Sequence, residues 1–102
     1  MNYRQRVLPA GWYPQDKNRI VQKIEEFKAQ FPIAKKNIFG GIVPHAGWEF
    51  SGKAALQVFL SCEHAPETCV VIGGHLSGRQ GILAAFEDAY ETPLGNMELD
   101  NE

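Results

Sequence analysis

The sequence predicts an α/β fold whose strands are mainly parallel, and three segments carry this prediction. Residues 37–43 and 68–72 are largely apolar, and the second run is rich in β-branched residues, as is typical of strands covered on both faces. Residues 51–60 between them have a helical pattern. Strand, helix and strand in this order predict a right-handed crossover that places both strands in one parallel sheet.

The chain ahead of the first predicted strand is expected to be irregular and then helical. Pro9, Gly11 and Pro14 break regular structure in residues 1–14. A helix is predicted to begin near Asp16 and to end at Pro32. Its apolar side chains recur at the spacing of one helical face and are Ile20, Ile24, Phe27 and Phe31.

The second helix is predicted to begin with Ser51 as its N-cap and to turn an apolar face toward the sheet. That face consists of Ala54, Ala55, Val58 and Phe59. Residues 81–90 form a third extended stretch, residues 92–95 a turn, and residues 97–100 the start of a further element. A small parallel sheet leaves an apolar edge unpaired. We therefore expect the opening of a larger α/β domain, or a homo-oligomer that pairs through this edge.

Composition and charge exclude several classes of protein. The chain has 102 residues, enough for one domain or part of one, and its 44% apolar and 22% charged residues argue against disorder. A formal net charge of -2 argues against a general nucleic-acid binder, which needs a basic surface. No apolar stretch is long enough to span a membrane, and no signal-peptide core follows Arg4 and Arg6. We expect a cytoplasmic protein with no membrane partner, in which Cys62 and Cys69 are reduced structural thiols.

Each predicted buried strand is followed closely by a histidine, His45 after the first and His75 after the second. Ligands of open α/β sheets bind beyond the carboxyl ends of the strands, and imidazole is a common metal ligand. Two histidines from neighbouring strand ends therefore form half of a metal or acid–base site. The carboxylates nearest in sequence are Glu49, Glu87 and Asp88, and the spacing selects none of them. In the alternative interpretation each histidine hydrogen-bonds a loop carbonyl.

Ser51 and four aromatic residues form a second candidate feature near His45. The helix that begins at Ser51 presents unpaired N–H groups toward the predicted crevice, where an anion could bind, although an ordinary capped helix explains the same residues. Neither a phosphate-binding loop nor a nucleophile elbow is present in the sequence. The aromatic residues could line a pocket or simply pack, and they are Trp12, Tyr13, Trp48 and Phe50.

Four sequence elements, in this order, resemble the Memo family, also known as AmmeMemoRadiSam system protein B. They are AGWYP at residues 10–14, PHAGWEFSG at 44–52, VIGGH at 71–75 and TPLG at 92–95. The second element is highly specific. The resemblance covers nearly all of this chain but only the N-terminal part of the family's domain. Residues 1–102 are therefore interpreted as the N-terminal part of a single Memo-like α/β domain.

The resemblance implies a fold like that of the class III extradiol dioxygenases, an α/β/α sandwich of which this chain would be a part. It implies a divalent metal, iron or copper, with His45 as the first ligand and His75 as the second. Many members carry Gly-Pro-Ser-His at the second ligand, where this chain has Gly-Gly-His-Leu. The family's third ligand is a cysteine from a later segment, which neither Cys62 nor Cys69 matches. Trp12 corresponds to an aromatic residue that lines the family's pocket.

Three functions stay open on the sequence. The first is a Memo-like metal-binding protein with redox or oxygenase-type chemistry on an unknown small molecule, and with Trp12, Trp48 and Ser51 in its pocket. The second is a non-catalytic module that binds an anion or an anionic peptide, since members of the family are linked to phosphotyrosine-peptide recognition. The third is an inactive truncated remnant.

Overall fold

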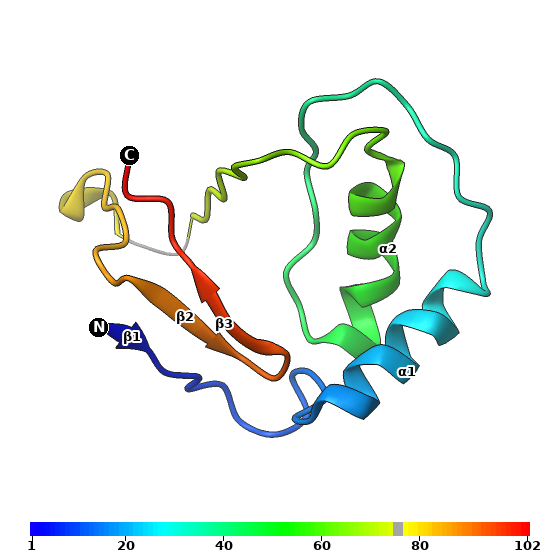
Figure 1. Ribbon diagram of the computed structural model, residues 1–102, viewed down its shortest axis with the longest axis horizontal. Coiled ribbons are helices and arrows are strands. Elements are labelled where there is room, and N and C mark those ends of the chain that lie inside the picture. Colours follow the sequence, from blue (N-terminus) through cyan, green and yellow to red (C-terminus); the bar gives the residue numbers. More distant parts are fainter. Residues whose placement is uncertain (75–76) are drawn as a thin grey trace.

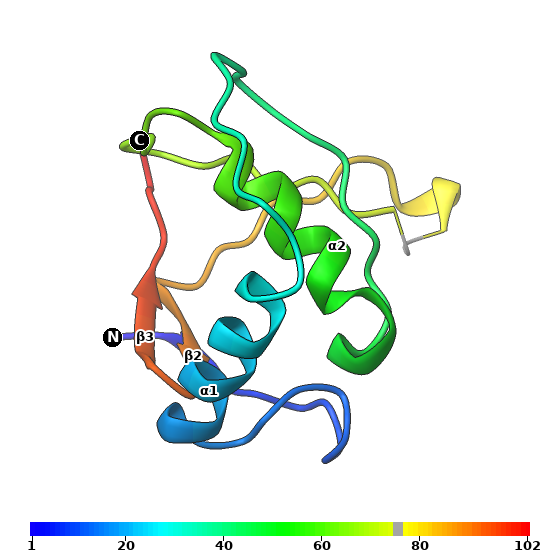
Figure 2. The ribbon, with the colours of Figure 1, turned by 90° about the vertical axis from the view of Figure 1, so that its right-hand side faces the viewer.

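The structure, a computed structural model, describes residues 1–74 and 77–102 and combines two α-helices with a small sheet (Figure 1). Its elements follow the chain as β1 (Tyr3–Arg4), α1 (Lys17–Lys28), α2 (Trp48–Ser61), a 3-10 helix (Gly78–Gln80), β2 (Ala89–Thr92) and β3 (Gly95–Glu98). Helix α1 lies next to both α2 and the hairpin of β2 and β3 (Figure 2). The α/β class predicted from the sequence is confirmed.

The sheet is mixed, with the strand order β1-β2-β3. β1 pairs parallel with β2, which places Tyr3 opposite Ala89, and β2 pairs antiparallel with β3. Thr92 lies opposite Gly95, so the predicted turn at residues 92–95 is confirmed as the tip of the hairpin. We expected a mainly parallel sheet, but only one of the two strand pairings is parallel.

Ion pairs fasten the N-terminal strand to the hairpin. Glu87, which precedes β2 and is buried, accepts a hydrogen bond of 2.8 Å from Nε of Arg4 and lies 2.7 Å from an Nη atom of the same guanidinium. The backbone N–H of Arg6 donates to a carboxylate oxygen of Glu91 at 3.0 Å. These contacts hold a strand of two residues that has little capacity to form on its own.

Helix α1 begins where the sequence predicts it, because both its cap and its apolar face are local features, but it ends at Lys28, four residues before the predicted end at Pro32. The side chain of Asp16 accepts a hydrogen bond of 3.0 Å from the backbone N–H of Arg19, which satisfies one of the unpaired groups of the first turn. Ile20 and Phe27 are buried, and Ile24 and Phe31 on the same predicted face are half-buried.

Helix α2 begins three residues earlier than predicted. Its first residue is Trp48 and its N-cap is Gly47, so Ser51 lies in the first turn and is not the cap. The predicted inner face holds only in part, since Phe59 is 60% exposed. Gly52 forms the contact with α1, because a Cβ there would lie only 2.8 Å from Cε2 of Phe27.

The strands predicted at residues 37–43 and 68–72 are wrong. Both segments lack regular secondary structure, and in the second Val70, Val71 and Ile72 are between 81% and 91% exposed. A strand needs a neighbour to satisfy its backbone groups. Within the described ranges, the chain around these segments pairs only in one isolated parallel bridge, between Lys36 and Cys62. The predicted βαβ crossover therefore does not form here.

The elements predicted after residue 80 also differ from the observed strands. Of the expected extended stretch at residues 81–90, only Ala89 and Tyr90 belong to a strand. The element expected at residues 97–100 is the end of β3, which stops at Glu98.

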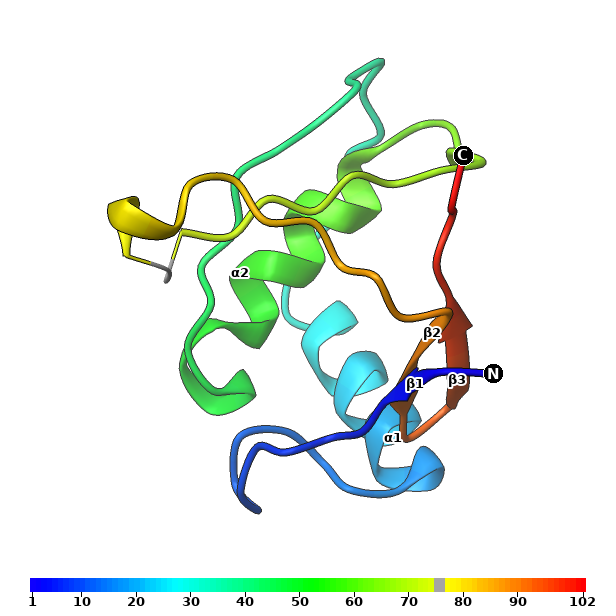
Figure 3. The same ribbon diagram turned by 90° about the vertical axis from the view of Figure 1, so that its left-hand side faces the viewer.

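Residues 37–46 run alongside α2 as an irregular segment (Figures 1 and 3). Gly41 approaches Val58 so closely that a Cβ at this position would clash with the Val58 side chain. Absence of a side chain at Gly41 therefore allows the segment to pack on the helix.

Candidate functional site

The first feature of the candidate site is a junction between two segments that are distant in the sequence. The backbone N–H of Trp48, the first residue of α2, donates a hydrogen bond of 2.8 Å to the carbonyl of Trp12. Trp12 is itself part of a turn, since its N–H donates to the carbonyl of Pro9 at 3.4 Å. The structure thereby joins the AGWYP segment to the PHAGW segment through their backbones.

The turn that follows His45 is held from the helix side by Ser51. Oγ of Ser51 donates to the carbonyl of Ala46 at 2.8 Å and lies 3.3 Å from the carbonyl of Gly47. Ser51 is only 6% exposed, so this hydrogen bond is shielded from competing water. Ser51 therefore fixes the backbone directly after His45, although it does not cap the helix.

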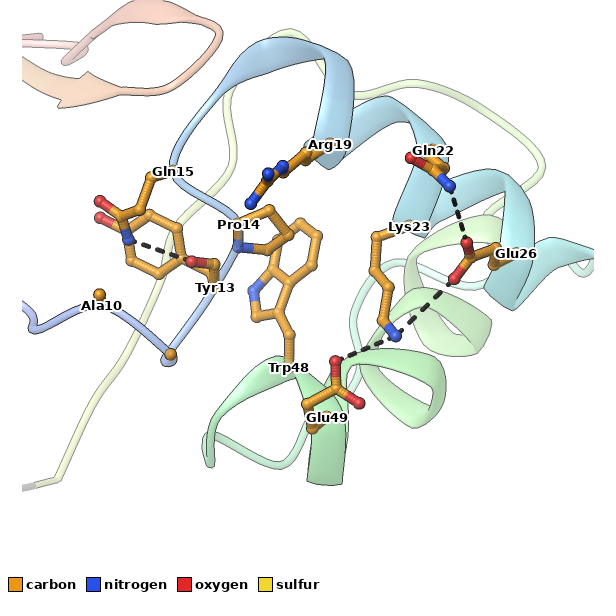
Figure 4. A pocket seen from close by; sticks show the side chains of 11 residues that line it. Ala10, Tyr13, Pro14, Gln15, Arg19, Gln22, Lys23, Glu26, Trp48 and Glu49 are labelled. Atoms are coloured by element: carbon orange, nitrogen blue, oxygen red, sulfur yellow. Dashed lines mark hydrogen bonds and ion pairs between the residues drawn. The ribbon is translucent and has the colours of Figure 1, made fainter.

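A pocket of about 470 Å³ opens between the AGWYP segment, α1 and the first turn of α2 (Figure 4). Tyr13, Pro14 and Trp48 provide its aromatic and apolar wall. The full lining is Ala10, Gly11, Tyr13, Pro14, Gln15, Arg19, Gln22, Lys23, Glu26, Trp48 and Glu49. Trp48 therefore lines this pocket, whereas Trp12 and Ser51 are not among its lining residues.

Lys23 is the central charge of this first pocket. Its Nζ lies 3.0 Å from a carboxylate oxygen of Glu49 on α2 and 3.8 Å from one of Glu26, and it also stands over the ring of Phe27 at 5.1 Å from the centroid. The hydrogen bond to Glu49 raises the pKa of Lys23 despite the opposing effect of desolvation. Lys23 is therefore a fixed cation that links α1 to α2 across the pocket (Figure 4).

A second pocket of about 540 Å³ lies on the hairpin side of α1. Its lining combines Tyr13, Ile20, Ile24 and Trp48 with residues 91–97 of the hairpin. Tyr13 and Trp48 line both pockets, so these two aromatic side chains stand between them. No local pattern in the sequence predicts the hairpin wall or the Lys23–Glu49 pair, because both depend on contacts between segments that are distant in the sequence.

Of the two predicted metal ligands, His45 is among the described residues. His45 is exposed at the end of the irregular segment that runs along α2, and His75 lies outside the described residues. The three carboxylates that the sequence offered as a third ligand have other partners. Glu49 pairs with Lys23, Glu87 with Arg4, and Asp88 accepts from the backbone N–H of Asn2 at 2.6 Å.

The described residues do not by themselves fit a metal ion. Within residues 1–74 and 77–102, no three His, Cys, Asp or Glu side chains gather closely enough to hold one. A stable site for a transition metal uses three or more protein ligands. His45 can therefore provide one imidazole, and the other ligands would have to come from elsewhere.

A family model described as Memo-like protein matches residues 4–102 of this chain. Among similar proteins, a MEMO1 family protein of Aquifex aeolicus is 34% identical over 106 residues, and one of Ignicoccus hospitalis is 31% identical over 115 residues; each alignment covers 100% of this chain. A MEMO1 family protein of Methanosarcina barkeri is 29% identical over 99 residues, or 97% of the chain. No solved structure gives a significant match.

The chain spans well under half the length of these relatives. The alignments cover 38% of the Aquifex protein, 40% of the Ignicoccus protein and 37% of the Methanosarcina protein. In the described part of the chain, neither helix has the length and apolar character needed to cross a membrane.

Proposed function

Because the chain belongs to the Memo-like protein family, we propose that it builds the N-terminal part of a metal-binding Memo domain. In this proposal His45 supplies one imidazole ligand and His75 a second to a divalent metal, iron or copper. The whole domain would be an α/β/α sandwich of the class III extradiol dioxygenase type. We also propose a cytoplasmic location, where Cys62 and Cys69 remain reduced thiols.

The observation that supports this role is the fixed turn directly after His45. Ser51 Oγ binds the Ala46 carbonyl, and the Trp48 N–H binds the Trp12 carbonyl, so the turn is held by two hydrogen bonds from two different segments. Metal ligands need a rigid backbone, since coordination tolerates little error in ligand position. A histidine that simply faced solvent from a loop would not require a buried serine behind it.

The roles of the surrounding residues follow from their contacts. Trp48, whose backbone is bonded to Trp12, would form an aromatic wall near the metal region, and Ser51 would position the turn that carries His45. A bound iron or copper ion would supply redox chemistry to a small molecule. The residues of this chain would hold the imidazole and shape the wall, and the remaining ligands would come from outside the described residues.

A metal titration of the 102-residue chain tests this proposal. We expect Fe(II), added anaerobically, or Cu(II) to bind this chain weakly, through the two imidazoles of His45 and His75, so that His45→Ala weakens binding by at least about tenfold. His64→Ala is the matched control, because His64 lies in an exposed loop away from the fixed turn. Equal metal affinity for the wild-type chain and His45→Ala would contradict the proposal.

A second candidate function is the binding of an anionic peptide, and the position of Arg19 beside the aromatic wall of the first pocket favours it. Lys23 is already paired with Glu49, whereas the ion pair of Arg19 within the described residues is an exposed one with Asp16 at 3.5 Å. Arg19 next to Tyr13 and Trp48 suits a phosphate or carboxylate attached to an apolar or aromatic group. A phosphotyrosine peptide titrated against Trp fluorescence tests it. We expect Arg19→Gln to weaken binding and Arg79→Gln, in the exposed 3-10 helix, to leave it unchanged. Peptide binding that survives His45→Ala while metal binding is absent would favour this candidate, and binding of neither would favour the inactive remnant.

A further inference from the structure

The second pocket, on the hairpin side of α1, is assigned no ligand by either proposed function. Its volume of about 540 Å³ lies within the range of about 300–1,000 Å³ that is typical of small-molecule sites. Such sites are mostly apolar and contain a few polar groups that orient the ligand. The larger apolar and aromatic side chains that line this pocket are Tyr13, Ile20, Ile24, Trp48, Leu94 and Met97. This lining suits the apolar body of a small molecule.

Charge distinguishes this pocket from the first one. The first pocket is lined by two cations and two carboxylates, namely Arg19, Lys23, Glu26 and Glu49. Of the described residues that line the second pocket, Glu91 alone carries a charge. A ligand there meets one negative charge in apolar surroundings, where electrostatic interactions are stronger than in water.

Strand β2 directs Glu91 toward the inner face of the hairpin. Side chains alternate along a strand, so Glu91 lies on the same face as Ala89, which is fully buried. The Glu91 side chain is 40% exposed, so a solute can reach it. Asn96 lies directly opposite Glu91 in β3, and residues in this position share one face of the sheet. A carboxylate and a carboxamide are therefore neighbours on the wall of the pocket.

Glu91 is held in place but is not saturated with hydrogen bonds. Its Oε2 accepts from the backbone N–H of Arg6 at 3.0 Å. Its Oε1 lies 3.5 Å from Nε of Arg6, a longer separation than the roughly 2.7–2.9 Å of a charge-assisted hydrogen bond. An Nη atom of the same guanidinium donates to the carbonyl of Gln15 at 3.2 Å, so Arg6 offsets the charge of Glu91 only in part. Because a carboxylate has about four acceptor positions, Glu91 has the capacity to bind an N–H donor of a ligand.

We propose that the second pocket binds a small organic amine, with its apolar body between α1 and the hairpin and its ammonium group on Glu91. The amide oxygen of Asn96 can accept a further N–H bond. Trp48 and Tyr13 favour a cation over a neutral group, since the faces of aromatic rings attract positive charge. Glu91 would repel a phosphate or carboxylate, the ligand proposed for the first pocket. The proposal goes beyond both proposed functions, because it concerns a ligand of opposite charge in another pocket and needs no metal.

NMR titration of the 102-residue chain with three phenyl compounds of similar size tests this proposal. The compounds are 2-phenylethylamine, a cation, 2-phenylethanol, which is neutral, and 3-phenylpropanoate, an anion. Without added metal, we expect the amine to bind at least about tenfold more tightly than the alcohol, because a charge-assisted hydrogen bond adds to the same apolar contacts. The anion should bind more weakly than the alcohol. Backbone signals of residues 91–97 should shift with the amine, whereas those of Ala10 and Gly11, which line only the first pocket, should not.

Glu91→Gln is the decisive variant, because glutamine keeps the shape of the side chain and can still accept from the Arg6 N–H. It should weaken binding of the amine at least about tenfold and leave binding of the alcohol unchanged, which shows that the pocket is intact. Leu94→Ala should weaken binding of both compounds about threefold, through lost apolar contact. Glu98→Gln is the matched control, because Glu98 is exposed on β3 and does not line the pocket.

Three results would overturn the proposal. The first is equal affinity for the amine and the alcohol, or no saturable binding of the amine. The second is an equal effect of Glu91→Gln and Glu98→Gln on amine binding. The third is a shift of the Ala10 and Gly11 signals in place of those of residues 91–97.

Discussion

The junction at the start of α2 and the apolar segments at residues 39–44, 68–74 and 81–86, called the open segments, differ in how their backbone groups are satisfied. At the junction, Trp48 and Ser51 bond to Trp12 and Ala46 across segments, and Phe27 packs against Gly52. In the open segments no backbone–backbone hydrogen bond exists among the described residues, and the one bond of Thr68 to a distant segment runs from its side chain to Asp100. The difference shows that apolar, β-branched sequence makes an extended chain, but only a neighbouring strand makes it a β-strand.

The largest expected effect comes from removing the packed core residue Phe27. Phe27 is 7% exposed between α1 and α2, so Phe27→Ala should lower the free energy of unfolding by about 3 kcal/mol, through lost burial and a residual cavity. Urea denaturation followed by circular dichroism measures the change. Phe50→Ala is the control, since Phe50 is 89% exposed on α2 and its loss should cost less than about 0.5 kcal/mol. An equal loss of unfolding free energy in both variants would contradict the burial of Phe27 between α1 and α2.

A smaller effect is expected from Ser51→Ala, which tests the fixed turn. The substitution removes the shielded hydrogen bond to the Ala46 carbonyl and should cost about 1 kcal/mol by the same measurement. Ser61→Ala is the matched control, because Ser61 Oγ makes a similar bond of 2.6 Å to the Gln57 carbonyl at a more exposed position. A Ser61→Ala loss as large as that of Ser51→Ala would argue against a special role for the turn.

A third, pH-dependent effect concerns the attachment of β1. Burial raises the pKa of Glu87, but hydrogen bonds and the charge of Arg4 more than offset this and hold the pKa below its usual value. A carboxylate with a depressed folded-state pKa contributes stability that is present above the unfolded-state pKa of about 4.3 and is lost as the pH falls through the folded-state value. Melting temperatures measured from pH 7 to pH 3 should therefore fall less steeply for Glu87→Gln than for the wild-type chain. Glu98→Gln, on exposed β3, should follow the wild-type profile, and a Glu87→Gln profile identical to wild type would show that the ion pair is not formed.

The smallest effect is expected in the open segments themselves. Ile72 is 91% exposed, so Ile72→Lys should change the free energy of unfolding of the isolated chain by less than about 0.5 kcal/mol. Denaturation by urea measures it alongside the Phe27 series. A loss above 2 kcal/mol, on the order of a buried aliphatic side chain, would show that Ile72 is buried in solution.

The parts of the fold that the sequence predicts correctly are those that depend on local contacts. Asp16 caps α1, and Ile20 and Phe27 occupy the predicted face, because capping and helical periodicity involve residues within a few positions of one another. The turn at residues 92–95 was predicted for the same reason. The start of α2 was missed by three residues, since the bond from Trp48 to the distant Trp12 carbonyl leaves no local signature.

Long-range pairing accounts for the rest. The two-residue strand β1 exists only because Tyr3 and Arg4 pair with β2. A strand this short has too few residues to show an alternating hydrophobic pattern in the sequence. The strands predicted at residues 37–43 and 68–72 have the right composition but no partner among the described residues. At the site, the sequence predicts Trp48 as a pocket residue. The ion pair of Lys23 with Glu49 joins two different helices, so only the structure reveals it.

Native-state amide hydrogen exchange of the isolated 102-residue chain tests the division between these regions most directly. Amides of α1 around Phe27 and of α2 beyond Ser51 should exchange at least about tenfold more slowly than those of residues 68–72, which should exchange at the rate of an unstructured peptide. Protection of residues 68–72 equal to that of α1 would mean that they are already paired, and the account of the open segments would be wrong.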